Sequence, residues 1–173
     1  MIVSVPSAAP DIDLLALYDR GVADVYGYLL ARCRNRADAE DVTSDVFLAA
    51  VDAVRNRPVA DASVAWLIGI ARHKLVDHWR RREREQRRIE AVAGEPERDD
   101  DPWDVHLDVL AARDVLAELG AHHRAALTLR YLDGLSVPEV ADVLGRTVHA
   151  TEALLVRARH AVRRRLVDEE DSP

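Results

Sequence analysis

The stretch Ser136-Val-Pro-Glu-Val-Ala-Asp-Val-Leu-Gly145-Arg-Thr147 decides how the C-terminal part of the chain folds. Ser136 and Glu139 form a capping-box pattern, in which a hydroxyl and a carboxylate satisfy backbone N–H groups at a helix start. Gly145 suits the left-handed conformation that ends many helices, and Thr147 can cap the helix that follows. The pattern therefore predicts a short helix over 137–144, a tight turn and a second, longer helix.

The second helix is predicted to bury one face and to carry arginines around the rest. Its expected inner face is Val148, Thr151, Leu155, Ala158, Val162 and Leu166. Two helices joined by a tight glycine turn, the second longer and basic, are typical of a helix-turn-helix. An ordinary helical hairpin with a solvated basic face is the alternative.

In a helix-turn-helix the second helix enters the major groove of DNA, so its exposed early residues meet base edges. Arg157 can bond a guanine or simply a phosphate, and Glu152 can accept from a cytosine amine. The candidate DNA contacts are Thr147, His149, Ala150, Glu152, Ala153, Val156, Arg157 and His160.

Working outward, the N-terminal part shows helical periodicity in three segments. Apolar residues at steps of three and four predict a helix over 11–32 and another over 37–55. Asp61 or Ser63 can cap the third. On the second helix the aspartates lie opposite the apolar face, so they are predicted to be exposed. Such an acidic stripe either solubilises that surface or docks on a basic protein.

The third helix becomes basic as it proceeds. Eight basic and three acidic residues lie between 72 and 88. A solvated charge run is the simplest explanation, but a second basic helix in the same chain favours contact with nucleic acid.

Periodicity disappears between about 89 and 104, where the run Gly94-Glu-Pro-Glu-Arg-Asp-Asp-Asp-Pro102 is acidic and helix-breaking. This segment is predicted to be a flexible linker between two small helical domains. A helix with Leu107, Leu110, Val115, Leu116 and Leu119 should open the second domain, followed by one over 121–132. The fold class is therefore all-α, with a tail at 1–10, domains at 11–88 and 105–167, a linker at 89–104 and an acidic tail at 168–173.

Composition excludes several classes of function. The net charge is −7, although the charges are segregated along the chain, and Cys33 is the single cysteine. No apolar run reaches the roughly 20 residues of a membrane span, and the start lacks a basic signal-peptide region, which predicts a cytoplasmic protein without membrane insertion. His73 and His78 are five residues apart, off metal-ligand spacing, and no catalytic constellation can be assembled. We expect no enzyme activity, metal, cofactor or small-molecule substrate.

These pieces, in their order and spacing, resemble the extracytoplasmic-function (ECF) group of the sigma-70 family, which retains the second and fourth sigma domains. The resemblance covers about residues 14–166 and rests on several stretches. They include Ala37-Asp-Ala-Glu-Asp-Val42, Ala65-Trp-Leu-Ile-Gly-Ile-Ala-Arg72, Ala126-Leu-Thr-Leu-Arg-Tyr131 and Gly134-Leu-Ser-Val-Pro-Glu-Val-Ala141.

The resemblance implies an alternative sigma factor that gives RNA polymerase promoter specificity, with core polymerase, promoter DNA and a probable anti-sigma factor as partners. It implies that sigma domain 2 docks on the polymerase clamp through Asp38, Glu40, Asp41, Asp45 and Phe47. It also implies contacts to the −10 element from Asn56, Arg57, Asp61, Ser63, Arg72, Arg80 and Arg81. Sigma domain 4 would read the −35 element through the helix after Thr147. The alternative is a helix-turn-helix regulator that binds duplex DNA without polymerase.

Overall fold

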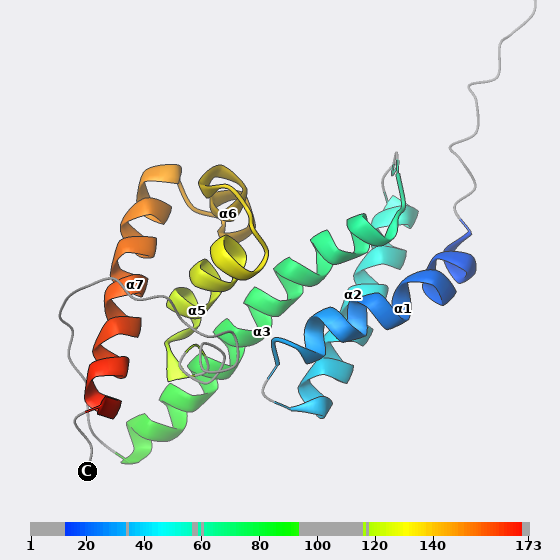
Figure 1. The fold of residues 1–173 in the computed structure, drawn as a ribbon. Helices are drawn as coiled ribbons and strands as arrows, with labels where there is room; N and C mark the ends of the chain where they lie inside the picture. Colours follow the sequence, from blue (N-terminus) through cyan, green and yellow to red (C-terminus); the bar gives the residue numbers. More distant parts are fainter. Residues whose placement is uncertain are drawn as a thin grey trace, which may run out of the picture. The chain divides into compact units, whose positions relative to one another are not determined.

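A computed structural model describes residues 13–33, 35–56, 59, 61–93, 116 and 118–170. Every regular element in those ranges is a helix, which confirms the predicted all-α class (Figure 1). Among the helices described, none is both long and apolar enough to cross a membrane. Several predictions fall outside the described residues. They concern the contact from Arg57, the linker from residue 94 onward, the helix around Leu107 and Leu110, and both tails apart from 168–170.

The chain divides into two compact units, residues 1–74 and 75–173, and the division falls inside the third helix. Residues 1–74 are called unit 1 and residues 75–173 unit 2.

Unit 1 begins with helix α1 (Leu14–Leu30), which packs against α2 (Arg36–Asn56). Asp13 caps α1, because its carboxylate accepts from the backbone N–H groups of Leu15 and Ala16 at 3.1 and 3.0 Å. The two helices bury part of the apolar stripes that the sequence predicts, with Val25, Leu29, Val42 and Val46 fully buried. Leu15, Tyr18 and Leu30, which the periodicity also assigns to the stripe of α1, are exposed.

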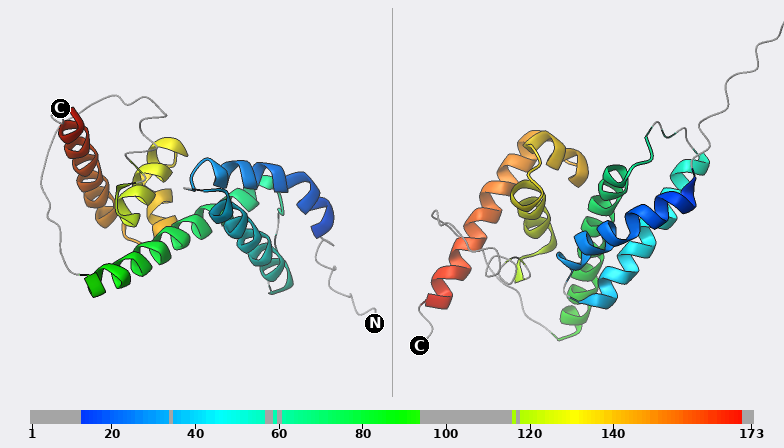
Figure 2. Two further views of the ribbon diagram at one scale, coloured as in Figure 1. Left: turned by 90° about the horizontal axis from the view of Figure 1, so that it is seen from below. Right: turned by 45° about the vertical axis from the view of Figure 1, so that its right-hand side comes forward.

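Helix α3 (Val64–Ala93) contributes its first part to unit 1, and Figure 2 shows it as one continuous helix. The Ser63 hydroxyl accepts from Trp66 N at 3.3 Å, so Ser63 is the cap at its start. Leu67 is buried against α1 at Gly21, where an added Cβ would lie 2.6 Å from Leu67 Cδ1. A larger residue at Gly21 would therefore clash with α3. The helix continues to Ala93, four residues beyond the predicted start of the linker at 89.

Unit 2 contains the rest of α3 together with α5 (Ala121–Leu127), η1 (Thr128–Leu132), α6 (Val137–Leu144) and α7 (Val148–Glu170). Helix α7 packs against both α5 and α6 (Figures 1 and 2). One buried cluster of this unit joins Leu127 of α5 to Ala158 and Val162 of α7, together with Leu119.

Two details of unit 2 differ from the prediction. The single helix predicted over 121–132 changes at Thr128 into a π-helical turn, because Asp133 N donates to Thr128 O, five residues back. Val148, predicted on the inner face of α7, is 43% exposed because it lies in the first turn, at the edge of the packed surface.

Candidate nucleic-acid and protein interfaces

The start of α6 is held by the predicted capping box. Ser136 N donates to Glu139 Oε2 at 2.7 Å, and the Ser136 hydroxyl is 2.6 Å from the same carboxylate oxygen. In return, Glu139 N donates to Ser136 Oγ at 3.5 Å. These bonds satisfy donors that the first turn of a helix cannot satisfy by itself, so the helix begins at a defined residue.

The turn between α6 and α7 is equally well determined. Gly145 has φ +63° and ψ +43°, the left-handed conformation that ends a helix, and Arg146 N donates to Ala141 O at 2.9 Å. The Thr147 hydroxyl then accepts from Ala150 N at 3.2 Å and caps α7. The predicted helix-turn-helix geometry is therefore present.

Helix α7 presents one face to solvent and packs with the other. Thr151, Leu154, Leu155 and Ala158 are buried. The candidate DNA contacts lie off that buried face: Thr147, His149, Glu152, Ala153, Val156 and Arg157 are exposed, and Ala150 and His160 are half-buried. The structure thus places seven of them on the side of α7 opposite its buried residues, and Thr147 at the N-cap of the same helix.

Sequence reasoning missed a polar contact beside that face. Arg159 Nη1 donates to the Tyr131 hydroxyl at 3.1 Å, and both side chains are exposed. Tyr131 belongs to the π-helical turn, whose five-residue hydrogen bonds leave no periodic signal in the sequence.

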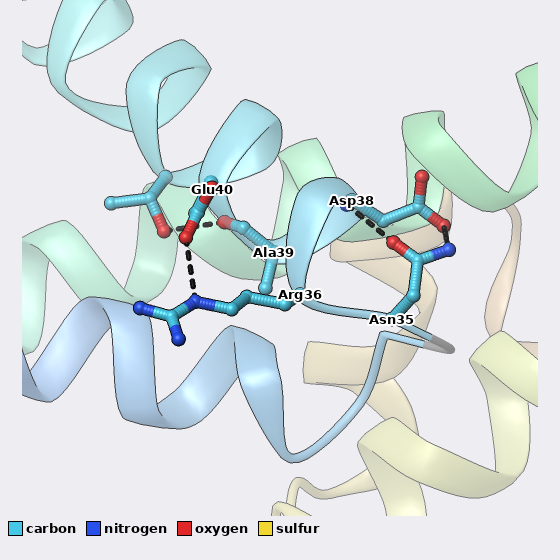
Figure 3. Close-up of polar contacts among 6 residues, drawn as sticks. Asn35, Arg36, Asp38, Ala39 and Glu40 are labelled. Atoms are coloured by element: carbon cyan, nitrogen blue, oxygen red, sulfur yellow. Dashed lines mark hydrogen bonds and ion pairs between the residues drawn. The ribbon is translucent and has the colours of Figure 1, made fainter.

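The first turn of α2 carries two of the candidate protein-binding acids (Figure 3). Asp38 N donates to Asn35 Oδ1 at 2.8 Å, and Asn35 Nδ2 donates to Asp38 Oδ2 at 3.2 Å. Arg36 Nε donates to Glu40 Oε1 at 2.9 Å. Asp38 and Glu40 are therefore oriented by neighbours on the same turn.

The remaining members of that set follow along α2. Asp41 is exposed, while Asp45 and Phe47 are half-buried. The Phe47 ring meets the ring of Tyr18 edge-on, with centroids 4.8 Å apart. Asp41 is thus exposed as the sequence predicts, whereas the predicted exposure of Asp38 and Asp45 is only partial, since both are half-buried.

The candidate −10 contacts are distributed over several elements. Asn56 ends α2 with its amide donating to Asp52 O at 2.8 Å. Asp61 is exposed, and Ser63 is half-buried with its hydroxyl engaged as the α3 cap. Arg72 lies in unit 1 and is half-buried.

The last two candidates lie in unit 2, on the second half of α3. Arg81 is exposed. Arg80 donates from Nη2 to Leu144 O at 2.9 Å and lies 3.7 Å from Asp77 Oδ1. The structure therefore presents Arg81 to solvent but engages Arg80 within unit 2.

No metal centre is found in the part of the chain that the structure describes, where no three histidine, cysteine or acidic side chains lie close enough to hold an ion. The candidate contact residues on α2, α3 and α7 instead form helix surfaces that carry accessible charges and hydrogen-bonding groups. A helix-turn-helix with an exposed recognition face, in a chain with a separate helical unit, defines a DNA-binding protein.

Comparison with known proteins gives the family. Residues 17–85 match the model of Sigma-70 region 2, and residues 110–162 match that of Sigma-70, region 4. The ECF RNA polymerase sigma factor SigL of Mycobacterium tuberculosis is 33% identical over 93% of this chain and 93% of its own length. This chain belongs to the ECF group of the sigma-70 family.

The sigma factor BldN of Streptomyces coelicolor is 34% identical over 88% of this chain, which spans 60% of BldN. Among solved structures, CnrH in complex with the cytosolic domain of CnrY is 26% identical with a TM-score of 0.53, over 92% of this chain and 89% of CnrH. The sigma factor RpoE in complex with the anti-sigma factor NepR, from Bartonella quintana, has a TM-score of 0.56 at 21% identity, over 89% of this chain and 96% of RpoE. This last likeness bears on the fold alone.

Proposed function

We propose that this ECF sigma factor reads the −35 element of its promoters through the exposed face of α7. The observation that carries the proposal is the α6–turn–α7 geometry, in which cap, left-handed glycine and second cap leave the candidate contacts on one open face. The side chains of this face span hydrogen-bond donors, an acceptor and apolar groups, the kinds that distinguish base pairs in the major groove.

We propose that core polymerase binds the acidic first half of α2. The support is the exposure of Asp41 and the alignment of Asp38 and Glu40 by their neighbours. A carboxylate already held in place loses less conformational entropy when a basic partner docks.

The remaining part of the proposal is contact with the −10 element by Asn56, Arg57, Asp61, Ser63, Arg72, Arg80 and Arg81. Arginines suit this task because they pair with phosphates and stack on unpaired bases. Extruding a base costs a few kcal/mol, so contacts available only to the single strand can drive promoter melting.

An anti-sigma factor completes the proposed set of partners, as the resemblance to the ECF group implies; the solved neighbour CnrH is in complex with the cytosolic domain of CnrY. We also propose that the two domains at 11–88 and 105–167 act at separate promoter elements across the linker at 89–104. The chain would act in the cytoplasm, where polymerase and DNA are, and its role is binding rather than catalysis.

Run-off transcription tests the proposal, with core polymerase, the chain and DNA from upstream of its own coding region. We expect transcripts that depend on the chain. Tight binding of the chain alone to duplex DNA, without chain-dependent transcripts on any candidate promoter, would instead establish a polymerase-independent regulator.

Asp41→Arg should weaken binding to core polymerase by about tenfold or more, because a reversed charge faces a basic partner. Fluorescence titration of the labelled chain with core measures this. Asp52→Arg is the matched control, since Asp52 is also an exposed acid of α2, about 16 Å further along the helix. Equal affinities of the two variants would reject the α2 interface.

A further inference from the structure

One hydrogen bond on the surface of unit 2 joins two elements that are distant in sequence. Arg159 Nη1 of α7 donates to the Tyr131 hydroxyl of η1 at 3.1 Å, 28 residues away, and both side chains are exposed. Neither residue is among the DNA contacts that the sequence predicts. We refer to Arg159 and Tyr131 as the surface pair.

The bond of the surface pair contributes little to the stability of the fold. Water competes for both groups, and the long arginine side chain loses rotamer freedom when the bond forms. Arg165, another exposed arginine of α7, is bonded to a carboxylate, since its Nη1 donates to Glu118 Oε2 at 2.9 Å. The hydroxyl that holds Arg159 is neutral. It therefore orients the guanidinium without neutralising its charge.

The surface pair retains hydrogen-bond donors for an anion. A guanidinium has five N–H groups in a planar fork, and the hydroxyl uses one of them. The hydroxyl accepts that bond and keeps its own hydrogen to donate. The Arg130 guanidinium lies 6.0 Å from the Tyr131 ring centroid and adds a second positive charge beside the pair. N–H and O–H donors next to positive charge are suited to a phosphate.

The π-helical turn η1 provides a fixed support for the Tyr131 hydroxyl. Asp133 N donates to Thr128 O, five residues back, and Arg130 Nη1 donates to Leu135 O at 2.7 Å just after the turn. A wider turn changes the direction in which its side chains project, and such turns are frequent at functional sites. The segment that carries Tyr131 is thus held by hydrogen bonds of its own.

Arg159 continues the recognition face, the exposed side of α7 that carries the candidate DNA contacts. It follows Glu152 by seven residues and Val156 by three, and residues at these spacings share one side of a helix. It lies about 10 Å beyond Glu152 along the helix axis. In a helix-turn-helix the first turns of the second helix approach base edges, and residues further along meet the sugar–phosphate backbone. Arg159 therefore occupies the position of a phosphate contact.

We propose that the surface pair is a phosphate-binding site that flanks the bases read by α7, with Tyr131 as its positioning residue. The inference rests on the proposed function, in which α7 meets the −35 element. Because the hydroxyl already orients the guanidinium, Arg159 loses less conformational entropy when a phosphate binds. The site adds affinity without sequence preference.

The test measures binding of holoenzyme, assembled from core polymerase and the full-length chain, to duplexes from upstream of its own coding region. Arg159→Ala should weaken binding by about tenfold, alike for duplexes with altered −35 base pairs, and should lower the salt slope by about one. Arg165→Ala is the matched control, because it removes the same charge from the same helix at an arginine paired with Glu118. It should leave affinity and salt slope unchanged.

Tyr131→Phe keeps the ring and removes the hydroxyl. It should weaken binding by about threefold to tenfold and keep the salt slope of the wild type, because the charge of Arg159 remains. In an Arg159→Ala background the same change should have a smaller effect, since the hydroxyl acts through the guanidinium. The midpoint of thermal unfolding should stay close to that of the wild type, whereas loss of a structural hydroxyl would lower it.

Methylphosphonate substitution, which removes the charge of one phosphate at a time, locates the contact on the DNA. At one linkage beside the −35 element it should weaken binding of the wild type and leave binding of Arg159→Ala unaffected. The inference would be overturned if every linkage affected the two proteins equally, or if Tyr131→Phe caused the same loss with and without Arg159.

Failure of this inference is distinguishable from failure of the proposed function. If Arg157→Ala weakens −35 binding and Arg159→Ala does not, the phosphate site alone is wrong. If neither variant weakens binding, α7 is not the helix that meets DNA.

Discussion

Ser136, Thr147 and Glu83 each place an oxygen atom against backbone N–H groups at the start of a helix in unit 2. Ser136 and Thr147 each cap the helix that they immediately precede, and Glu83 reaches from another helix. Since the first N–H groups of a helix have no partner within it, each of these oxygens determines where a helix begins. The position of the recognition face therefore depends on single polar atoms.

Ser136→Ala should lower the free energy of unfolding of the protein by about 1 kcal/mol, because it removes the acceptor at the start of α6. Urea titration followed by circular dichroism measures this. Ser44→Ala is the control: the Ser44 hydroxyl is exposed within α2 and donates to Glu40 O at 3.1 Å. A loss for Ser44→Ala as large as that for Ser136→Ala would contradict the role assigned to the cap.

His122 should make stability depend on pH. Its pKa is lowered mainly because burial disfavours the charged imidazolium, and further by the positive charges of Arg146, Arg80 and Arg87, while Glu83 acts in the opposite direction. The unfolded chain binds the proton at about pH 6.5, before the folded chain does. The free energy of unfolding is therefore not reduced by His122 above that pH, and it falls as the pH drops below it, because only the unfolded chain then binds the proton readily.

Urea unfolding at pH values about one unit above and one unit below the ordinary histidine pKa measures the effect. His122→Gln should lose less stability on acidification than the wild type. His149→Gln, which removes an exposed histidine, should lose as much as the wild type. Identical pH dependence of the wild type and His122→Gln would show that His122 does not contribute.

At the scale of helices, the sequence was sufficient to predict a helix end wherever a single nearby residue determines that end. The capping box at Ser136, the left-handed Gly145 and the Thr147 cap can all be predicted from neighbouring residues, and the structure contains them. The π-helical turn after Leu127 could not be predicted, since its apolar spacing is also compatible with an α-helix. The Glu83–Ala121 bond joins residues 38 apart in sequence, and no local pattern reports such a pair.

Glycine substitutions distinguish backbone conformation from packing. Gly145→Ala should destabilise the protein by about 1 kcal/mol, because φ is positive there and an alanine Cβ would meet no other atom within 4 Å. Gly27→Ala should stabilise it by about 0.5–1 kcal/mol, because Gly27 lies inside α1 with equally open surroundings. Thermal unfolding of both variants checks the opposite signs, and shifts in the same direction would refute the conformational explanation.

Over the whole chain, a net charge of −7 conceals surfaces of opposite sign. Exposed acids lie on α2, whereas arginines concentrate on the second half of α3 and on α7. Such segregation allows one chain to meet a basic protein surface and DNA phosphates without the two partners competing for the same residues. The family assignment agrees with this division, since region 2 and region 4 models match separate ranges.

Arg157→Ala should weaken −35 recognition by the assembled holoenzyme, because Arg157 is exposed on the recognition face. Loss of a base contact would cost about 1–3 kcal/mol and would relax preference at one base pair. Loss of a phosphate contact would weaken all sequences alike and reduce the salt slope by about one. Competition between promoter duplexes at several salt concentrations separates the two results. Arg20→Ala, which removes an exposed arginine of α1, should leave both quantities unchanged. If Arg157→Ala behaved like Arg20→Ala, this face of α7 would not be the one that meets DNA.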